Sequence, residues 1–304
     1  MIENEFDLVN IKTVNFGVSL RPNADMYFVA TDVETKKALE SIFAETVAAF
    51  DSINGAWELY DISEDYGERR RIYVSRAEPL VADLSGVYNA GALTDLANIS
   101  DHLENIDYYF SEFIDNNGRR IIGLKKATTL KRTLKSRHRL IRLVDDTLEL
   151  IQEDVLRLDS EFDLLIAQDN IFILNVRPAE ATAKIVEKVA SAADTKVQVI
   201  HDSIPFLDLT RIKEKIGKHP RMARNAHSVA KRIDLALFNR DRILALSDKQ
   251  GIKFTELPNG RLQCRVTDEA KLLELLDARR YQVDLIGDGG DPYRATGRQK
   301  VSAD

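Results

Sequence analysis

The chain of 304 residues is 44% apolar and 30% charged with a net charge of −6, values typical of a globular protein with about two domains. Its single cysteine, Cys264, and five histidines exclude an internal disulfide framework and argue against a thiolate or histidine metal site. No apolar run reaches the roughly 20 residues of a membrane-spanning helix, and the first ten residues lack the basic and apolar parts of a secretory signal. We therefore expect a cytoplasmic protein without a metal or cofactor.

The first third of the chain predicts strands around one long helix. Residues 14–20 and 26–33 are rich in β-branched and aromatic side chains and are separated by the turn-like RPNAD. Residues 35–50 place apolar side chains at helical spacing, with Asp32 as the expected N-cap. Two further strands are expected at 57–62 and 71–77.

Asn116, Asn117 and Gly118 separate two apolar runs, 108–115 and 119–126, and an Asn-Gly pair in such a place predicts a β-hairpin. The following residues, 128–142, fit either an amphipathic helix or an extended basic connector. A further hairpin is expected at 161–176, where FDLLI and IFILNV flank AQDN.

The rest of the chain predicts mainly helices. A helical region from 178 to 232 is expected to break at Pro220 and restart there, and another helix is expected over 233–250. A hairpin should then turn at 258–260, and a helix should start with Thr267 as its N-cap. We expect the last fourteen residues to be loosely held, except for Tyr293.

These elements together predict the α+β class with two domains. The N-terminal domain, 1–145, is expected to be a mixed α/β unit with hairpins. The C-terminal domain, 146–304, is expected to contain the 161–176 hairpin, long helices and a small closing strand-helix unit.

Charge is distributed unevenly along the chain. Residues 1–118 hold 8 Lys or Arg against 22 Asp or Glu, whereas residues 119–142 hold 10 bases and no acid. A solvated helix face usually mixes both signs, so a run of one sign favours an anionic partner such as nucleic acid. Pairing with the acidic N-terminal domain or a protein is the alternative. The bases are Arg119, Arg120, Lys125, Lys126, Lys131, Arg132, Lys135, Arg137, Arg139 and Arg142.

A second basic segment lies at 210–232, with 8 bases against the single acid Glu214. The break between its two predicted helices is weakly similar to a helix-turn-helix motif, and a solvated helix face explains it equally well. The residues considered for DNA contact are Arg211, Lys215, Lys218, Arg221, Arg224, Lys231 and Arg232.

A metal-dependent nuclease is the catalytic alternative. Restriction-type folds carry an Asp on one strand and Glu-x-Lys on the next, and Asp163 lies at the first of these positions. Asn175, Val176 and Arg177 stand where Glu-x-Lys would be, which leaves too few oxygen ligands to hold Mg²⁺. We expect Asp163 to be a hairpin-surface residue.

Two segments of the second half resemble a known family. EFDLLIAQDNIFILNV (161–176), followed by a basic helical region, and RRYQVDLIGDGGDPYRATGRQKV (279–301) resemble a domain of formerly unknown function. Leu285, Tyr293 and Lys300 match its terminal pattern, whereas Val283 and Ile286 replace the usual Ser and Thr. The family is KwaB, of the Kiwa anti-phage defence system, and the resemblance covers about 150–304.

This resemblance implies a DNA-binding effector that acts beside a KwaA-like membrane subunit, which recruits it to the inner membrane. Because Glu-x-Lys is missing, we expect this effector to be non-catalytic. It also implies an assembly, for which we expect a homodimer or higher homo-oligomer whose basic faces straddle a duplex. The alternatives are a nuclease with a divergent metal site, or a scaffold that binds only protein or anionic membrane partners.

Overall fold

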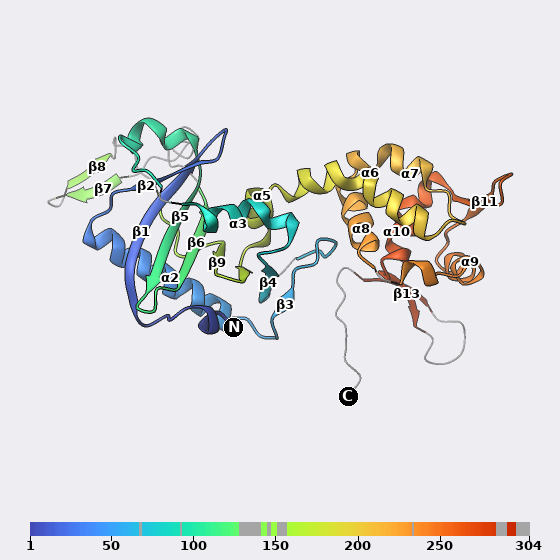
Figure 1. The fold of residues 1–304 in the computed structure, drawn as a ribbon, viewed down its shortest axis with the longest axis horizontal. Coiled ribbons are helices and arrows are strands. Elements are labelled where there is room, and N and C mark those ends of the chain that lie inside the picture. The colour runs from blue at the N-terminus through green and yellow to red at the C-terminus, as the bar shows by residue number, and fades with distance from the viewer. Residues whose placement is uncertain are drawn as a thin grey trace. The chain divides into compact units, whose positions relative to one another are not determined.

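The structure is a computed structural model that describes residues 1–66, 69–91, 93–127, 141–144, 147–150, 157–232, 234–283 and 291–295 (Figure 1). They fall into two compact units, Met1–Tyr60 with Glu68–Lys184 and Asp61–Gly67 with Ile185–Asp304. The expected α+β class is confirmed, because a mixed sheet and several helices occur together.

The first unit is built on an eight-stranded sheet with the order β2-β1-β5-β6-β9-β10-β4-β3. All neighbours are antiparallel except β3 and β4. The predicted hairpins β5–β6 and β9–β10 are confirmed, and the two predicted strands on either side of RPNAD pair as β1 and β2. The strands are β1 Ile11–Leu20, β2 Asp25–Val29, β3 Glu58–Leu59, β4 Ile72–Ser75, β5 Ile106–Asp115, β6 Arg120–Lys126, β9 Leu164–Ile166 and β10 Asn170–Ile173.

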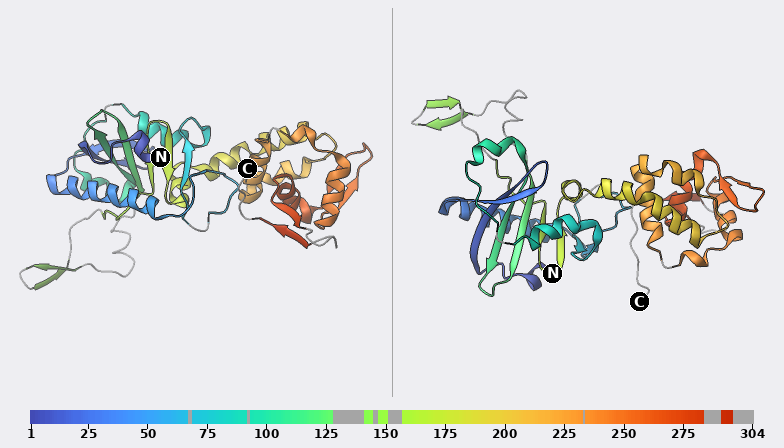
Figure 2. Two further views of the ribbon diagram at one scale, coloured as in Figure 1. Left: turned by 90° about the horizontal axis from the view of Figure 1, so that it is seen from below. Right: turned by 45° about the horizontal axis from the view of Figure 1, so that its top comes forward.

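Helices lie on both faces of this sheet (Figure 2). α2 (Val33–Ser52) begins where predicted, since the Asp32 carboxylate accepts a hydrogen bond from the Thr35 amide at 2.7 Å. Phe43 of α2 stacks on Phe113 of β5 with ring centroids 4.5 Å apart. The alternate residues of each strand point to the other face of the sheet. The other helical segments are α1 Ile2–Glu5, α3 Ala82–Asn89, α5 Val176–Thr182 and the 3-10 turns Pro79–Val81 and Ile99–Asn105.

The β9–β10 hairpin belongs to the first unit. β9 pairs with β6 and β10 pairs with β4, so the hairpin fills the middle of the sheet. The units therefore divide after Lys184. The sequence-based division at 145/146 differs, because it assigned this hairpin to the C-terminal domain.

A separate two-stranded sheet is formed by β7 (Ile141–Val144) and β8 (Thr147–Leu150). The amphipathic helix or connector considered over 128–142 lies mostly outside the described residues, and its last residues belong to β7.

The second unit is mainly helical with two hairpins. The helix restart at Pro220 and the hairpin at 258–260 are confirmed. None of the helices among the described residues is long and apolar enough to cross a membrane. The elements are α6 Ile185–Ser203, α7 Thr210–Lys215, α8 Pro220–Ala230, α9 Arg240–Lys249, α10 Glu269–Leu276, β11 Phe254–Glu256, β12 Leu262–Cys264, β13 Arg280–Val283, β14 Asp291–Arg294 and the 3-10 turns Ile216–Lys218, Leu235–Leu237 and Val266–Asp268.

Two helix starts in the second unit differ from the sequence-based prediction. The expected helix over 233–250 is a 3-10 turn followed by α9, because the Asn239 side chain accepts hydrogen bonds from the amides of Asp241 and Arg242 and caps a new helix. Thr267 lies inside the 3-10 turn that leads into α10, so it does not cap that helix, which starts after Asp268 without a side-chain cap.

Gly123 of β6 permits close packing that any side chain would prevent. A Cβ atom at this position would lie 2.4 Å from the Phe162 ring. Gly123→Ala should therefore lower the free energy of unfolding by about 1–3 kcal/mol, measured by urea denaturation. Gly86→Ala on α3 is the control: it meets open space and should be neutral or stabilising by up to about 1 kcal/mol. Equal stability of the two variants would contradict this packing.

Candidate nucleic-acid interface

The first bases of the predicted run are ion-paired within the sheet. The Arg119 guanidinium lies 2.7 Å from the Asp115 carboxylate at the β5–β6 turn. Arg120 pairs with Glu112 across the strands, donates to the Tyr88 carbonyl at 2.7 Å and lies over the Tyr88 ring. Much of the charge of these two arginines is therefore already balanced by acids of the first unit.

The Asp115 carboxylate organises the β5–β6 turn. It is fully buried and accepts backbone hydrogen bonds from Asp7, Asn117 and Arg119. Burial alone would raise the pKa of Asp115, but these bonds and the Arg119 guanidinium outweigh it and lower the pKa below its usual value.

The lowered pKa of Asp115 predicts an acid-dependent stability. A carboxyl whose folded pKa is depressed stabilises the fold above its unfolded pKa of about 3.9, and this stabilisation is lost as the pH falls through the folded pKa. Asp115→Asn should therefore be less stable than the unsubstituted chain at pH 7, with the gap closing below about pH 4. Chemical denaturation at both pH values measures it; a gap that is unchanged at low pH contradicts the assignment.

Lys125 and Lys126 are also engaged within the first unit. Lys125 Nζ lies 3.0 Å from Asp163 Oδ1 and 4.0 Å from Asp159 Oδ2. Lys126 Nζ lies 2.8 Å from the Asp107 carboxylate. These two lysines were predicted to contact nucleic acid, whereas their side chains contact Asp107 on β5 and two acids that precede β9.

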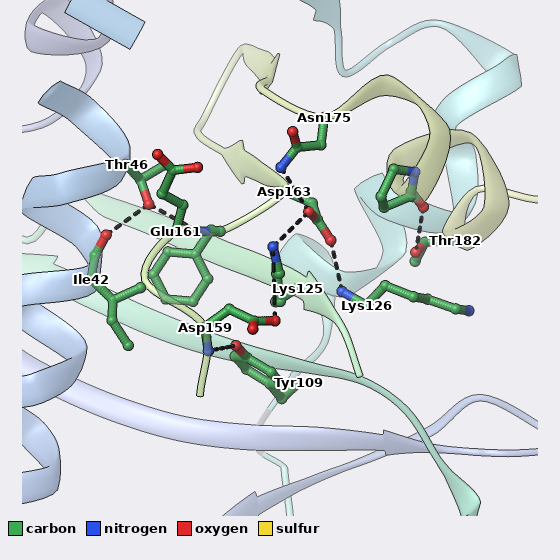
Figure 3. A network of polar contacts seen from close by, with 12 residues as sticks. Ile42, Thr46, Tyr109, Lys125, Lys126, Asp159, Glu161, Asp163, Asn175 and Thr182 are labelled. Atoms are coloured by element: carbon green, nitrogen blue, oxygen red, sulfur yellow. Dashed lines mark hydrogen bonds and ion pairs between the residues drawn. The ribbon is translucent and has the colours of Figure 1, made fainter. Parts of the chain in front are cut away.

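Asp163 is the centre of a buried hydrogen-bond network (Figure 3). Its side chain is only 2% exposed and accepts hydrogen bonds from Lys125 Nζ, the Lys126 amide and Asn175 Nδ2, at 2.9–3.0 Å. Its backbone also bonds to Leu124 and Leu174. The expectation of a hairpin-surface residue was therefore wrong: Asp163 joins β6, the entry to β9 and the exit from β10.

The same network contains Asp163, the residue that the nuclease alternative requires on its first strand. Both carboxylate oxygens of Asp163 accept hydrogen bonds from protein donors. One of these donors is the side chain of Asn175, the residue that stands where a metal-dependent nuclease would carry its second carboxylate. Within the described ranges, no group of three or more His, Cys, Asp or Glu side chains could hold a metal ion.

The aromatic side chains Tyr108, Tyr109 and Phe110, next to this network, are buried and belong to the core. The Tyr109 hydroxyl accepts a hydrogen bond from the Asp159 amide at 3.0 Å.

The single cysteine, Cys264, is buried. Burial raises the pKa of its thiol to about 12, so the thiol is protonated at neutral pH.

Five bases of the run, and the side chain of a sixth, have no described contacts. Arg142 lies in β7, in register with Glu149 of β8, and only its backbone is described. The remaining residues, Lys131, Arg132, Lys135, Arg137 and Arg139, lie outside the described residues.

In the second basic segment several side chains contact acids or carbonyls of their own unit. Arg211 and Lys215 both pair with Glu269, whose side chain is buried. Arg224 donates to the Ile62 carbonyl at 3.1 Å. Arg232 donates two hydrogen bonds to the Asp234 carboxylate, and these bonds raise the pKa of the Arg232 guanidinium.

The other bases of this segment lie closer to solvent. Lys218 and Lys231 are exposed, and Arg221 is partly buried. Burial, together with the cations Arg279 and Arg294, lowers the pKa of Arg221. α8 does not fit the recognition helix of a helix-turn-helix motif, because most of its residues from Met222 to Val229 are buried, whereas a recognition helix presents its face to the major groove.

The sequence-based prediction did not include the acidic side chains that neutralise the basic side chains of β6. Glu112 and Asp115 stand on β5, and a hairpin places them near the bases of β6, so the predicted hairpin register could have found them. Asp159 and Asp163 reach the same strand only through the β6–β9 pairing.

The fold and its charge distribution define an α+β protein whose sheet-borne bases are neutralised internally. A family model described as "Kiwa protein KwaB-like" matches residues 103–285, which is more than half of the chain. The chain therefore belongs to the KwaB-like family and is a component of Kiwa anti-phage defence. The match runs over 103–285 instead of about 150–304, so it includes β5, β6 and the whole basic run but not Tyr293 and Lys300 of the terminal pattern. No curated protein and no solved structure matches the chain.

Proposed function

We propose that this protein is a non-catalytic DNA-binding component of Kiwa defence that contacts phosphates mainly through residues 131–139. The observation that carries this proposal is the composition of residues 127–140, which contain five Lys or Arg, one His and no acid. Such a segment neutralises phosphates, releases counterions and binds without base preference.

The ion pairs of the sheet narrow the proposed interface. Lys125 and Lys126 would have to leave Asp163 and Asp107 before they could contact a phosphate, and a buried acid left alone is costly. The bases beyond position 126 have no acid within their own segment. We therefore assign the main phosphate contacts to 131–139 and a minor role to 119–126.

Band-shift titrations at several salt concentrations test the proposal. Binding should weaken linearly on a log–log plot as salt increases, with similar affinity for unrelated duplexes. An affinity that is independent of salt, or no binding at all, would contradict it. Cleavage of the DNA in the presence of Mg²⁺ would instead support the nuclease alternative.

The proposal includes a membrane partner of the KwaA type, peripheral recruitment to the inner membrane and a homodimer or higher homo-oligomer. A dimer would place two basic segments on one duplex and raise affinity through the effective concentration of the second site. Pull-down with the KwaA-like subunit in nuclease-treated extracts tests the partner. Light scattering over a wide concentration range tests the dimer, and a constant monomer mass would contradict it.

A further inference from the structure

The connection between β3 and β4 belongs partly to the second unit. β3 and β4 are parallel neighbours in the sheet of the first unit, whereas residues 61–67, between them in the chain, lie in the second unit. A connection between parallel strands usually packs back onto its own sheet. Ile62 and Ser63 of this segment are 4% and 0% exposed, although connecting segments usually run over the surface. Buried backbone and hydroxyl groups need hydrogen-bond partners, so specific contacts must hold the segment.

A buried ion pair of the second unit provides these contacts. Arg279 and Asp277 are both 0% exposed, and Arg279 Nε donates a hydrogen bond to Asp277 Oδ2 at 2.7 Å. Arg279 Nη2 donates to the Ser63 hydroxyl and lies 3.7 Å from the Asp61 carboxylate. Because a buried guanidinium needs acceptors for its donors, the second unit gains stability when this segment is in place.

The segment is also folded to present Ser63 to this arginine. Asp61 Oδ1 accepts hydrogen bonds from the Ser63 amide at 2.9 Å and from the Ser63 hydroxyl at 2.7 Å, which leaves the lone pairs of that hydroxyl for Arg279. Arg224 of α8 donates to the Ile62 carbonyl at 3.1 Å. Backbone and side chains of 61–63 are therefore both bonded within the second unit.

The strand before this segment has little structure of its own to hold it. β3 is only two residues long and lies at the edge of the sheet. The Glu58 amide donates to the Arg71 carbonyl at 2.7 Å, the Tyr60 amide donates to the Tyr73 carbonyl at 2.8 Å, and the Tyr60 hydroxyl bonds to Glu180 of α5. Short edge elements lie at the low end of local stability, so β3 is sensitive to whether the chain that follows it is held.

We propose that residues 61–64 are a strap that couples the second unit to the edge of the sheet. The bond between Arg279 and Ser63 holds the strap in place, and the strap holds β3 against β4. When that bond is lost, the segment gains conformational freedom and β3 opens more often. Coupling of this kind is reciprocal, so opening of β3 would equally loosen the strap. The inference goes beyond the proposed DNA binding and does not rest on it.

Hydrogen–deuterium exchange of the full chain, resolved by mass spectrometry, tests the strap at the amides of Glu58 and Tyr60. Arg279→Lys keeps a positive charge beside Asp277 but removes the planar guanidinium that also reaches Ser63. It should raise exchange of these amides by about tenfold to a hundredfold, as expected when a hydrogen bond from a charged group is lost. Residue 279 is 216 positions from Ser63, so the effect does not arise from neighbouring sequence.

Two serine variants accompany this measurement. Ser63→Ala removes the hydroxyl on the strap and should raise exchange at 58–60 as Arg279→Lys does. Ser228→Ala is the matched control, because it removes a buried hydroxyl that donates to Asp277 at 2.7 Å from α8 and is not on the strap. It should leave exchange at 58–60 unchanged. Exchange of β5, inside the sheet, should be unchanged in all three variants.

Three outcomes would overturn the strap. They are unchanged exchange at 58–60 in Arg279→Lys, an equal increase in Ser228→Ala, or an increase that extends to β5, which would show a general destabilisation of the first unit. No DNA is present in the experiment, so the strap and the proposed function stand or fall separately.

Discussion

Reversal of Lys131 and Arg132 to Glu should weaken DNA binding by a factor on the order of a hundred to a thousand at physiological salt. Each lost phosphate contact removes about one unit from the salt slope, and a reversed charge also repels the phosphate. The affinities for unrelated duplexes should fall by the same factor, because phosphate contacts carry no base information. Band-shift titrations at three or more salt concentrations provide both the affinity and the slope.

Two control variants separate this interface from a general charge effect. Lys184→Glu/Lys188→Glu changes the net charge by the same amount outside both basic segments and should have a much smaller effect. Arg119→Gln removes a base that is paired with Asp115 and should also matter little for binding. Equal weakening by the two double reversals would show that net charge alone governs binding. Normal binding by the Lys131/Arg132 variant would assign the basic run to a protein partner.

Asp163→Ala should destabilise the first unit by about 3–5 kcal/mol, because it leaves a lysine that was buried in an ion pair without its partner. Lys125 is mostly buried, and the Lys126 amide and the Asn175 side chain lose the same acceptor. An unsatisfied buried donor costs about 1–3 kcal/mol on its own, so the network loses more than one interaction. Urea denaturation of the full chain, followed through Trp57 of the first unit, measures the change.

Two comparisons isolate the buried charge as the cause. Glu161→Ala, in the same segment, breaks an ion pair with the half-exposed Arg69 and should cost about 1 kcal/mol or less. Asp163→Ala/Lys125→Met removes both charges and should recover part of the lost stability, because no unpaired ammonium remains. A double variant as unstable as Asp163→Ala, or Glu161→Ala equal to Asp163→Ala, would contradict a structural ion pair at this position.

The sequence by itself determined the features that depend on short stretches of chain. The Asn-Gly turn at 116–118, the Asp32 cap and the restart at Pro220 each act through residues a few positions away, so they could be read from spacing and residue type. The 161–176 hairpin was predicted for the same reason. The KwaB-like resemblance was also visible from residue patterns and agrees with the family match.

Only the tertiary structure decided which strands are neighbours and which charges remain free. β10 pairs with β4 and β9 with β6, partners distant in the chain, and a period of two fixes the faces of a strand but not its neighbour. For that reason the unit boundary falls after Lys184, and Asp163 is buried beside Lys125. A run of bases without acids suggests, from sequence alone, that its positive charges are unpaired. Electrostatic pairing depends on distance in space, and acids of the folded sheet neutralise the first bases of the run.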